Sequence, residues 1–411
     1  MAPLTRVCAA LLFGLATVAT ALDAPPLPLK SSSRWIVNAE NKRVKLKCIN
    51  WGGHMEVNIP EGLHKQPVDF LAEWIANAGF NCVRLTYSTD MALNPGLKVS
   101  DSFRAAAPAA GVSAESMSDM YTAAVGKNPW LESATIIDAH AKVVDALWSK
   151  GVMTILDNHV SRASWCCNLD DGNGWWASAP GYNEKNSRFF KTDEWLAGLQ
   201  AMASWAQGHK GVVGMGVRNE IREFLTQGTF NGRQDWYDQV SAAARLIHST
   251  HPDVLILIGG TLSSTDLSHV RTRPLDVSDW KEKHVWEWHA YSFTVNFHPI
   301  IKSCWYMRQL YGAFDGFLLE QGKPYTGPLI LSEFGFDQNS PDNFYLDCLR
   351  DYVVGNDGDW AIWALQGSYY ARNQQADFDE SFGVLNRDWS DWRNSDVKNK
   401  LGKMWDTTQG P

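Results

Sequence analysis

Two glutamates stand where apolar segments of the sequence end, and their side chains could act together. Glu220 closes the segment VVGMGVRNE, residues 212–220, and Glu333 falls within LILSEFG, residues 329–335. A buried strand that ends in an acidic residue places a carboxyl group at the edge of a sheet. Two carboxyl groups that meet at one edge can divide nucleophilic and acid–base work between them.

Glycoside hydrolysis is the reaction that this pairing favours. One carboxylate attacks the sugar or activates water, and the other, protonated near neutral pH, donates to the leaving oxygen. A separation of about 5–5.5 Å between the carboxyl groups predicts a retaining mechanism through a covalent glycosyl-enzyme. A single acid at the end of an apolar segment is more often a helix-start or salt-bridge residue, so the hypothesis depends on the pair.

Six further side chains fall at the ends of apolar segments and complete a predicted pocket. They are Arg84, His159, Asn219, His289, Tyr291 and Trp363. We expect Arg84 and Tyr291 to support Glu333, because a positive charge within about 4–6 Å lowers the pKa of a carboxyl group. The amide of Asn219 is suited to a hydrogen bond with a sugar 2-hydroxyl, a contact that strengthens in the transition state.

Glu287 is the main alternative to Glu333 as the second acid. It lies two residues before His289 in the segment VWEWHAYS, so alternation gives the two side chains the same facing. We rank Glu287 lower because it comes earlier in its strand and therefore deeper in the sheet. His289 itself is placed to contact Glu220 and to tune its acid–base role.

Eight apolar segments alternate with helix-length segments along the chain. They are residues 44–53, 81–88, 152–160, 212–220, 253–260, 285–292, 329–335 and 359–367. This alternation predicts a (β/α)8 barrel, in which catalytic residues gather at the carboxyl ends of the strands. An open doubly wound sheet is the alternative, but no glycine-rich phosphate loop follows the first strand.

Four long connections follow predicted strands and should lie on the catalytic face of the barrel. They cover residues 89–133, 161–190, 293–328 and 368–383. Extended loops on that face suit the selection of a substrate.

Composition excludes some partners and suggests another. The formal charge is −8, the sequence pI is about 5.8 and no basic stripe appears, which argues against nucleic acid. The 20 tryptophans stand out in the composition; a large core could explain them, and a surplus of exposed indoles would suit flat apolar faces such as sugar rings. We expect Trp51 and Trp176 to stack on sugar rings; the alternative for each is a purely structural role. Trp165 and Trp175 fall on the same face and are left open.

The chain is predicted to be a secreted monomer with one catalytic domain. Residues 1–21 have the charged start, apolar stretch and small-residue cleavage site of a signal peptide. Residues 22–34 form an extended lead-in, residues 35–395 the barrel, and residues 396–411 a tail. No segment reaches the roughly 18 apolar residues of a membrane span.

The cysteines fit an oxidising compartment. Six remain after the signal peptide, and they allow 15 full pairings. We expect Cys304 to pair with Cys348, and Cys82, inside an apolar strand, to be a buried free thiol. No Cys/His spacing of the zinc type occurs, and the proposed chemistry needs neither a metal nor another cofactor.

The ordered set of motifs resembles glycoside hydrolase family 5, the cellulase family. The matching motifs are RLTYS with Arg84, DNH with His159, RNEI with Glu220, WHAYS with His289 and Tyr291, and SEFG with Glu333. The resemblance covers about residues 35–395. It implies a retaining β-glycosidase with Glu220 as acid/base and Glu333 as nucleophile, and the six side chains above as the subsite around the cleaved bond.

The resemblance also implies a class of substrate. The segment DNHVSRASWCCNLDDGNGWW is similar to the branch with secreted plant and fungal cellulase-like members, and our first reading is an endo-β-1,4-glucanase. Mannan, other β-glucans and a β-glycoside or glycolipid are alternatives with the same mechanism. The adjacent Cys166 and Cys167 depart from many bacterial cellulases. A non-catalytic carbohydrate-binding barrel and a metal-dependent hydrolase are alternatives of other classes.

Overall fold

The computed structural model describes residues 23–223, 227–228, 231–294 and 302–411. The predicted signal peptide, residues 1–21, lies outside these described residues. Among the helices that the structure describes, none combines the length and apolar character needed to cross a membrane.

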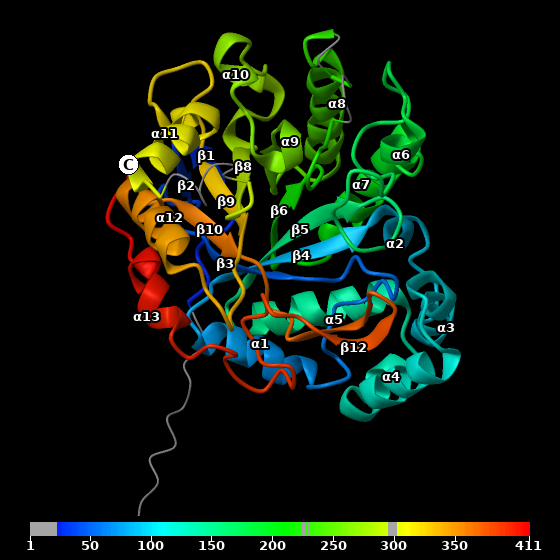
Figure 1. Cartoon of the computed structure of the whole chain (residues 1–411). Helices are drawn as coiled ribbons and strands as arrows, with labels where there is room; N and C mark the ends of the chain where they lie inside the picture. Colours follow the sequence, from blue (N-terminus) through cyan, green and yellow to red (C-terminus); the bar gives the residue numbers. More distant parts are fainter. Residues whose placement is uncertain (1–22, 224–226, 229–230, 295–301) are drawn as a thin grey trace, which may run out of the picture.

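Eight parallel strands close into a barrel, as the sequence predicts (Figure 1). They are β3 (Lys47–Trp51), β4 (Cys82–Ser88), β5 (Met153–Val160), β6 (Val212–Gly216), β7 (Leu255–Gly259), β8 (His284–Ala290), β9 (Leu329–Phe334) and β10 (Asp359–Ile362). Each strand pairs with the next, and β10 closes the ring on β3. Almost every strand residue is buried, which explains why the segments read as continuous apolar runs.

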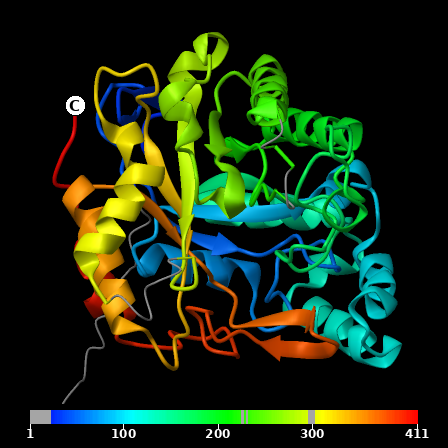
Figure 2. The ribbon, with the colours of Figure 1, turned by 45° about the horizontal axis from the view of Figure 1, so that its top comes forward.

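Six long helices alternate with these strands and surround the barrel (Figure 2). They are α1 (Val68–Asn77), α5 (Ile136–Ser149), α7 (Thr192–Ala206), α8 (Gln234–Thr250), α11 (Cys304–Phe314) and α12 (Asn343–Asn356). The start of α5 shows how the sequence sets such a boundary. Thr135 and Asp138 form a reciprocal capping box there, which satisfies amide groups that would otherwise lack partners.

The long connections after the strands carry structure of their own. Residues 89–133 form α2 (Thr89–Leu93), α3 (Val99–Ala110), α4 (Ala114–Lys127) and the short η1 (Pro129–Glu132). After β10 the chain forms a hairpin of β11 (Ser368–Arg372) and β12 (Gln375–Asp379), which packs beside α4 (Figure 2). Connections far apart in the sequence therefore meet around one face.

The remaining elements are short. They are β1 (Lys30–Ser32), β2 (Trp35–Val37), α6 (Glu184–Ser187), α9 (Thr261–Ser264), α10 (His269–Thr272), η3 (Ser278–Lys283), η4 (Gly316–Leu319), α13 (Val397–Leu401) and η5 (Gly402–Trp405). The antiparallel pair β1 and β2 belongs to the segment before the barrel, and Leu29 and Ile36 pack into the apolar cluster of the strands.

The barrel interior changes character along the strands. Toward their beginnings, side chains such as Cys48, Met153, Leu255 and Ile330 form one apolar cluster. Toward their ends, the inward side chains are ionisable or amide groups. An apolar plug at one end supports a polar site at the other, as the general plan of this fold requires.

Three cysteine pairs lie in disulfide contact. Cys304 and Cys348 join α11 to α12, as predicted. Cys48 and Cys82 join β3 to β4, so the expectation of a free thiol at Cys82 is wrong. The two residues are register partners on neighbouring strands, a proximity that an apolar strand sequence alone does not reveal. The third pair joins the sequence neighbours Cys166 and Cys167.

Candidate active site

Arg84 organises the polar end of the barrel from the middle of β4. Its Nη1 donates to Glu333 Oε1 at 2.8 Å and to Asn50 Oδ1 at 3.1 Å. Its Nη2 donates to Asp157 Oδ1 at 2.8 Å and to Asn219 Oδ1 at 2.9 Å. The guanidinium is fully buried, so these charge-assisted bonds form where water does not compete. One side chain thereby fixes groups from four strands or strand ends.

Glu333, on β9, has both carboxylate oxygens engaged. Oε1 accepts from Arg84, and Oε2 accepts from the Tyr291 hydroxyl at 3.0 Å. His289 Nδ1 lies 3.8 Å from Oε2. Burial raises the pKa of this carboxyl group, and the charges of His289 and Arg84 oppose that rise. The contacts predicted for Arg84 and Tyr291 are therefore present in the structure.

Glu220 has a different environment. It lies four residues beyond the end of β6 at Gly216, so the predicted strand of residues 212–220 ends earlier than expected. His289 Nδ1 is 3.2 Å from Glu220 Oε1, the contact that the sequence predicts. Burial is the largest influence on this carboxyl group and raises its pKa to about 7, although the Arg222 charge opposes the effect. A carboxyl group with such a pKa carries a proton near neutral pH.

The two glutamates face one another across a short gap. Single carboxylate oxygens of Glu220 and Glu333, together with a ring nitrogen of His289, all lie within 4.8 Å of one another. These three side chains could also ligate a cation. Cys166, Cys167 and Glu220 form a second cluster of that size, but its sulfurs are joined to each other and offer no thiolate.

A cavity of about 310 Å³ opens over the paired carboxyl groups. It is lined by His159, Trp165, Cys166, Cys167, Asn219, Glu220, Tyr291, Phe293, Glu333, Trp363, Arg372, Glu380 and Phe382. Six of the residues predicted for the site are among these, and so is Trp165, whose role the sequence leaves open. Arg84 and His289 do not line this cavity and contact the glutamates from behind it.

His159 and Trp363 form one wall of the cavity. Their rings stack with centroids 5.4 Å apart and an interplanar angle of 13°. His159 Nδ1 lies 2.6 Å from Asp157 Oδ2, which fixes the orientation of the ring. Burial lowers the pKa of His159, so the ring is neutral near pH 7. A neutral ring beside an indole suits contact with a sugar.

Two tryptophans expected to touch substrate lie elsewhere. Trp51 is fully buried, and its indole nitrogen donates to the Glu61 carbonyl at 2.9 Å. Trp176 is also fully buried and packs against Trp175, Phe190 and Trp195. Neither lines the cavity: Trp51 is the last residue of β3 and Trp176 lies in the connection after β5, and both rings pack into the core.

Glu287 is buried beneath the cavity and does not line it. One of its oxygens lies 3.7 Å from Arg84 Nη2, and burial raises the pKa of its carboxyl group. Glu287 therefore shares the buried polar cluster with His289, as alternation along the strand predicts, but it does not reach the cavity where a substrate would bind.

The other wall of the cavity comes from long connections, and the sequence gives no residue-level signal for most of it. The Arg372 guanidinium lies 3.3 Å from the centroid of the Trp165 ring and donates to Glu380 Oε2 at 2.6 Å. Phe382 closes the same side. The sequence predicts this wall only in outline, because it places the connections 161–190 and 368–383 on the catalytic face of the barrel.

Comparison with known proteins identifies the family. The family model "Cellulase (glycosyl hydrolase family 5)" matches residues 37–368. A glycosyl hydrolase 5 family protein of Chamaecyparis obtusa is 36% identical over 410 residues, which cover 98% of this chain and 70% of that protein. An endoglucanase of Paenibacillus polymyxa is 22% identical over 387 residues, which cover 90% of this chain and 85% of that protein.

Solved structures show the same fold. The catalytic domain of the major endoglucanase of Xanthomonas campestris pv. campestris has a TM-score of 0.70 at 20% identity, with 92% of this chain and 99% of that chain covered. A hyperthermophilic endocellulase of Pyrococcus horikoshii has a TM-score of 0.71 at 18% identity, with 94% and 100% covered. With the family model matching most of its length, the chain belongs to glycosyl hydrolase family 5.

Proposed function

We propose that the protein is a retaining β-glycosidase that hydrolyses β-1,4-glucan as an endoglucanase, with Glu333 as nucleophile and Glu220 as acid/base. The observation that carries the proposal is the short gap between the two carboxyl groups. One oxygen of Glu220 lies within 4.8 Å of one oxygen of Glu333. Retaining enzymes place these groups about 5–5.5 Å apart, whereas inverting enzymes need about 6.5–9.5 Å to admit water.

In the first step Glu333 attacks the anomeric carbon. Arg84 and the Tyr291 hydroxyl each bond one of its oxygens, which keeps the carboxylate in place at the cavity that it lines. Glu220, with a pKa of about 7, gives its proton to the leaving oxygen as the glycosidic bond breaks. The products of this step are a glycosyl ester on Glu333, an ionised Glu220 and the departing sugar or alcohol.

In the second step water enters where the leaving group was. The ionised Glu220 removes a proton from the water as its oxygen attacks the anomeric carbon. The ester bond breaks, Glu333 recovers its carboxylate, and Glu220 is again protonated. The His289 ring lies 3.2 Å from Glu220 and can orient the carboxyl group through both steps. The sugar is released with its original configuration.

Asn219 is the proposed partner of the sugar 2-hydroxyl. Arg84 occupies its amide oxygen, which leaves the amide nitrogen directed toward the cavity side. The ring faces of Trp363 and His159 would support the same sugar from one side. These contacts involve this chain's own side chains, and the proposed chemistry uses neither a metal nor another cofactor.

The choice of substrate rests on relatives and on chemistry. The relatives from Paenibacillus polymyxa and Xanthomonas campestris are named endoglucanases, and a Pyrococcus horikoshii endocellulase has been solved in complex with cellotetraose. Three cysteine pairs are typical of a secreted protein, and one relative is named a major extracellular endoglucanase. We propose that this chain is likewise secreted and acts as a monomer on a β-linked polysaccharide or oligosaccharide.

A second candidate function is hydrolysis of a β-glycoside with an apolar aglycone, such as a glycolipid. A second cavity, of about 300 Å³, is lined by His289, the residue that contacts the acid/base Glu220. The rest of its lining consists mainly of apolar side chains. Examples are Leu262, Leu310, Tyr311 and Phe314. This cavity supports the second candidate because it borders His289, which contacts Glu220, the proposed proton donor to the leaving group.

The test is hydrolysis of a substrate panel. It contains carboxymethylcellulose, barley β-glucan, mannan, xyloglucan, laminarin, aryl β-glycosides and an alkyl β-glucoside, with Glu220→Ala and Glu333→Ala as controls. Cleavage of carboxymethylcellulose that both variants abolish supports the proposal. Cleavage confined to the alkyl glucoside supports the second candidate instead. Sugar binding without any turnover would favour a carbohydrate-binding barrel, and inhibition by a chelator would favour a metal-dependent hydrolase.

A further inference from the structure

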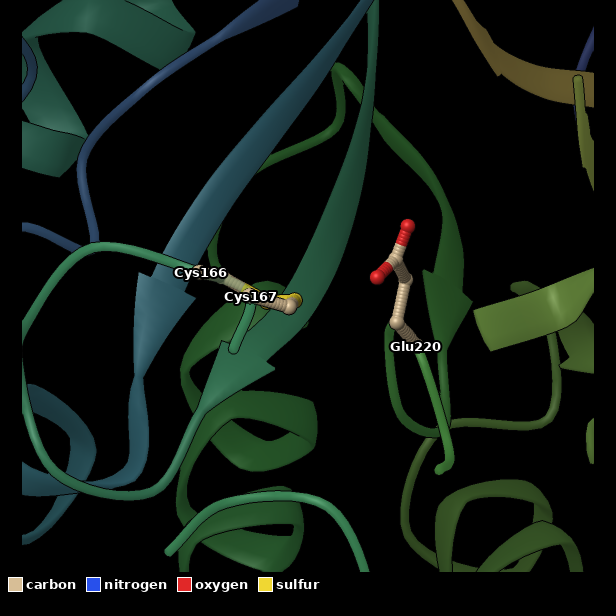
Figure 3. Close-up of side chains that lie close together, drawn as sticks. All are labelled: Cys166, Cys167 and Glu220. Atoms are coloured by element: carbon tan, nitrogen blue, oxygen red, sulfur yellow. A yellow bond between two sulfur atoms is a disulfide. The ribbon is translucent and has the colours of Figure 1, made fainter. Parts of the chain in front are cut away.

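The adjacent cysteines after β5 lie inside the candidate active site. Figure 3 shows the Cys166–Cys167 disulfide facing the Glu220 side chain, with the two groups carried by different loops. Both cysteines line the same cavity as Glu333. The mechanism above gives them no task. An S–S link offers no hydrogen to donate and presents a soft, apolar surface to whatever occupies the cavity.

The two sulfurs lie against the amide nitrogen of Asn219. Asn219 Nδ2 is 3.5 Å from Cys166 Sγ and 3.8 Å from Cys167 Sγ. The amide oxygen points the other way and accepts from Arg84 at 2.9 Å. The remaining neighbour of Nδ2 among the described hydrogen bonds is His159 Nε2, at 3.4 Å. The amide group is thus held between a guanidinium on one side and a pair of sulfurs on the other.

This arrangement leaves the amide nitrogen ready for a better acceptor. Nδ2 carries two hydrogens, and His159 Nε2, 3.4 Å away, can accept one of them. The other hydrogen faces the sulfurs, which accept only weakly, so it keeps most of its donor capacity while its direction is fixed by contact. A hydroxyl oxygen entering the cavity is a stronger acceptor than either sulfur. In place of the disulfide, a hydroxyl or carboxylate side chain would compete with the sugar for the same donor.

Arg222 ties the disulfide to the acid/base segment. Its Nη1 lies 3.6 Å from Cys166 Sγ and donates to the Glu220 carbonyl at 2.8 Å. Its Nη2 donates to both oxygens of Asp171 at 2.8 Å, and Asp171 belongs to the same loop as the cysteines. The position of the sulfurs relative to Asn219 and Glu220 is therefore set by a buried ion pair, not by loop packing alone.

We propose that the Cys166–Cys167 disulfide is a positioning element that directs the Asn219 amide toward the 2-hydroxyl of the sugar whose bond is cleaved. The proposal rests on the retaining mechanism above. It makes the disulfide a determinant of specificity at carbon 2, because a sugar without an equatorial 2-hydroxyl gains nothing from the directed amide.

The test compares two substrates that differ in one hydroxyl. They are 4-nitrophenyl β-cellobioside and its analogue that lacks the 2-hydroxyl on the sugar at the cleaved bond. The quantity measured is the ratio of kcat/KM for the first substrate to kcat/KM for the second. This ratio does not depend on the fraction of folded enzyme, so a loss of stability in a variant cannot imitate the expected change.

The Cys166→Ala/Cys167→Ala variant should lower this ratio about tenfold, the effect of weakening one hydrogen bond. Asn219→Ala should lower it by at least as much, and combining the three substitutions should add little, because the disulfide acts through Asn219. The matched control Cys304→Ala/Cys348→Ala removes a disulfide between α11 and α12 and should leave the ratio unchanged.

Reduction of the wild-type enzyme gives a second measurement that needs no variant. A water-soluble phosphine converts the disulfide to two thiols, while the phosphine takes oxygen from water and becomes its oxide. Alkylation and peptide mass spectrometry then identify the reduced pair. Enzyme reduced at Cys166 and Cys167 should show the lowered ratio.

An unchanged ratio in both the double variant and the reduced enzyme would overturn the positioning role while leaving the mechanism intact. An equal loss on both substrates would assign the disulfide to general loop structure and would also overturn it. If the wild-type enzyme cleaves neither substrate, or Glu333→Gln leaves cleavage unchanged, the proposed function itself fails.

Discussion

The two walls of the cavity are built in different ways. The wall from the strand ends is held by bonds among buried groups: Arg84, behind the cavity, contacts Glu333 and Asn219, and Tyr291 contacts Glu333 from the other side. In the wall from the long connections, the Arg372–Glu380 ion pair is joined by ring contacts, in which Arg372 lies over Trp165 and Trp165 meets other aromatic rings edge-on.

This difference separates two tasks. Groups fixed by several charge-assisted bonds in a buried framework hold their geometry to a fraction of an ångström, which bond cleavage requires. Groups on long connections can vary between relatives without disturbing the barrel, which suits substrate selection. We therefore expect substitutions in the strand-end wall to lower kcat on every substrate, and substitutions in the connection wall to change KM for some substrates.

The largest effect is expected at the two glutamates, and it should separate their roles. Glu333→Gln should lower kcat by a factor of about 10³ or more on all substrates, because no other group can form the glycosyl ester. Glu220→Ala should have a similar effect on polysaccharide but retain much activity on a dinitrophenyl glycoside, whose leaving group needs no proton. Stopped-flow kinetics on both substrates measures this difference.

Equal losses for the two variants on the dinitrophenyl substrate would contradict the assignment of roles. Circular dichroism of both proteins serves as the control for folding. Glu287→Gln provides the comparison within the same buried cluster, since Glu287 does not line the cavity.

Arg84→Met should produce the next largest effect. It removes the bonds to Glu333, Asn219 and Asp157 at once and leaves buried carboxylates without their counter-charge. We expect kcat to fall about 10²-fold with little change in KM, together with a lower melting temperature. Isothermal titration with cellotetraose on the folded variant checks that binding persists. A change confined to KM would contradict the division of tasks between the walls.

The strand-end wall is also the part that the sequence predicts well. Glu220, Glu333, Arg84 and His289 could be found because strand ends in a (β/α)8 barrel converge, so position along each apolar segment reports position in the site. The fold itself followed from eight apolar segments with helical patterns between them. The predicted strands are a few residues longer than the strands in the structure. The prediction of a free thiol at Cys82 is wrong because its disulfide partner lies on a neighbouring strand.

The connection wall could not be predicted in the same way. Arg372 and Glu380 lie at the two ends of a hairpin that folds back over the barrel, and nothing periodic marks either residue. The same limitation explains Trp176, which was expected at the surface of its loop but packs into the core. The position of the long connections predicts where substrate selection can occur. The side-chain contacts that these connections make depend on tertiary packing, which the sequence pattern does not show.

The pH dependence of kcat/KM should reflect the strand-end wall. Glu220 must be protonated for the first step, so activity is present below its pKa of about 7 and declines as pH rises through that value. Glu333 must be ionised, so activity also declines at the acid side. In the Glu220→Ala variant on the dinitrophenyl glycoside, the decline above about pH 7 should disappear, because the group that titrates there is gone. A basic limb that persists in this variant would assign it to another residue.

Substitution in the connection wall should have a smaller and substrate-dependent effect. Arg372→Ala removes the partner of Glu380 and the cation over Trp165, so this side of the cavity loses its order. We expect KM for cello-oligosaccharides to rise roughly three- to tenfold, with kcat changed less than about twofold. Arg387→Ala, which removes an ion pair between the exposed Arg387 and Asp377 on the same hairpin, is the matched control. A fall in kcat as large as that of Arg84→Met would contradict the comparison.

The smallest effect on catalysis is expected at Trp51. It is fully buried and donates to the Glu61 carbonyl, so Trp51→Phe should lower the free energy of unfolding by roughly 1–3 kcal/mol through the lost bond and volume. KM and kcat below the melting transition should stay within about twofold of the wild type. Urea denaturation and steady-state kinetics measure the two quantities side by side. A rise in KM with unchanged stability would restore Trp51 as a sugar contact and would show that the cavity extends toward β3.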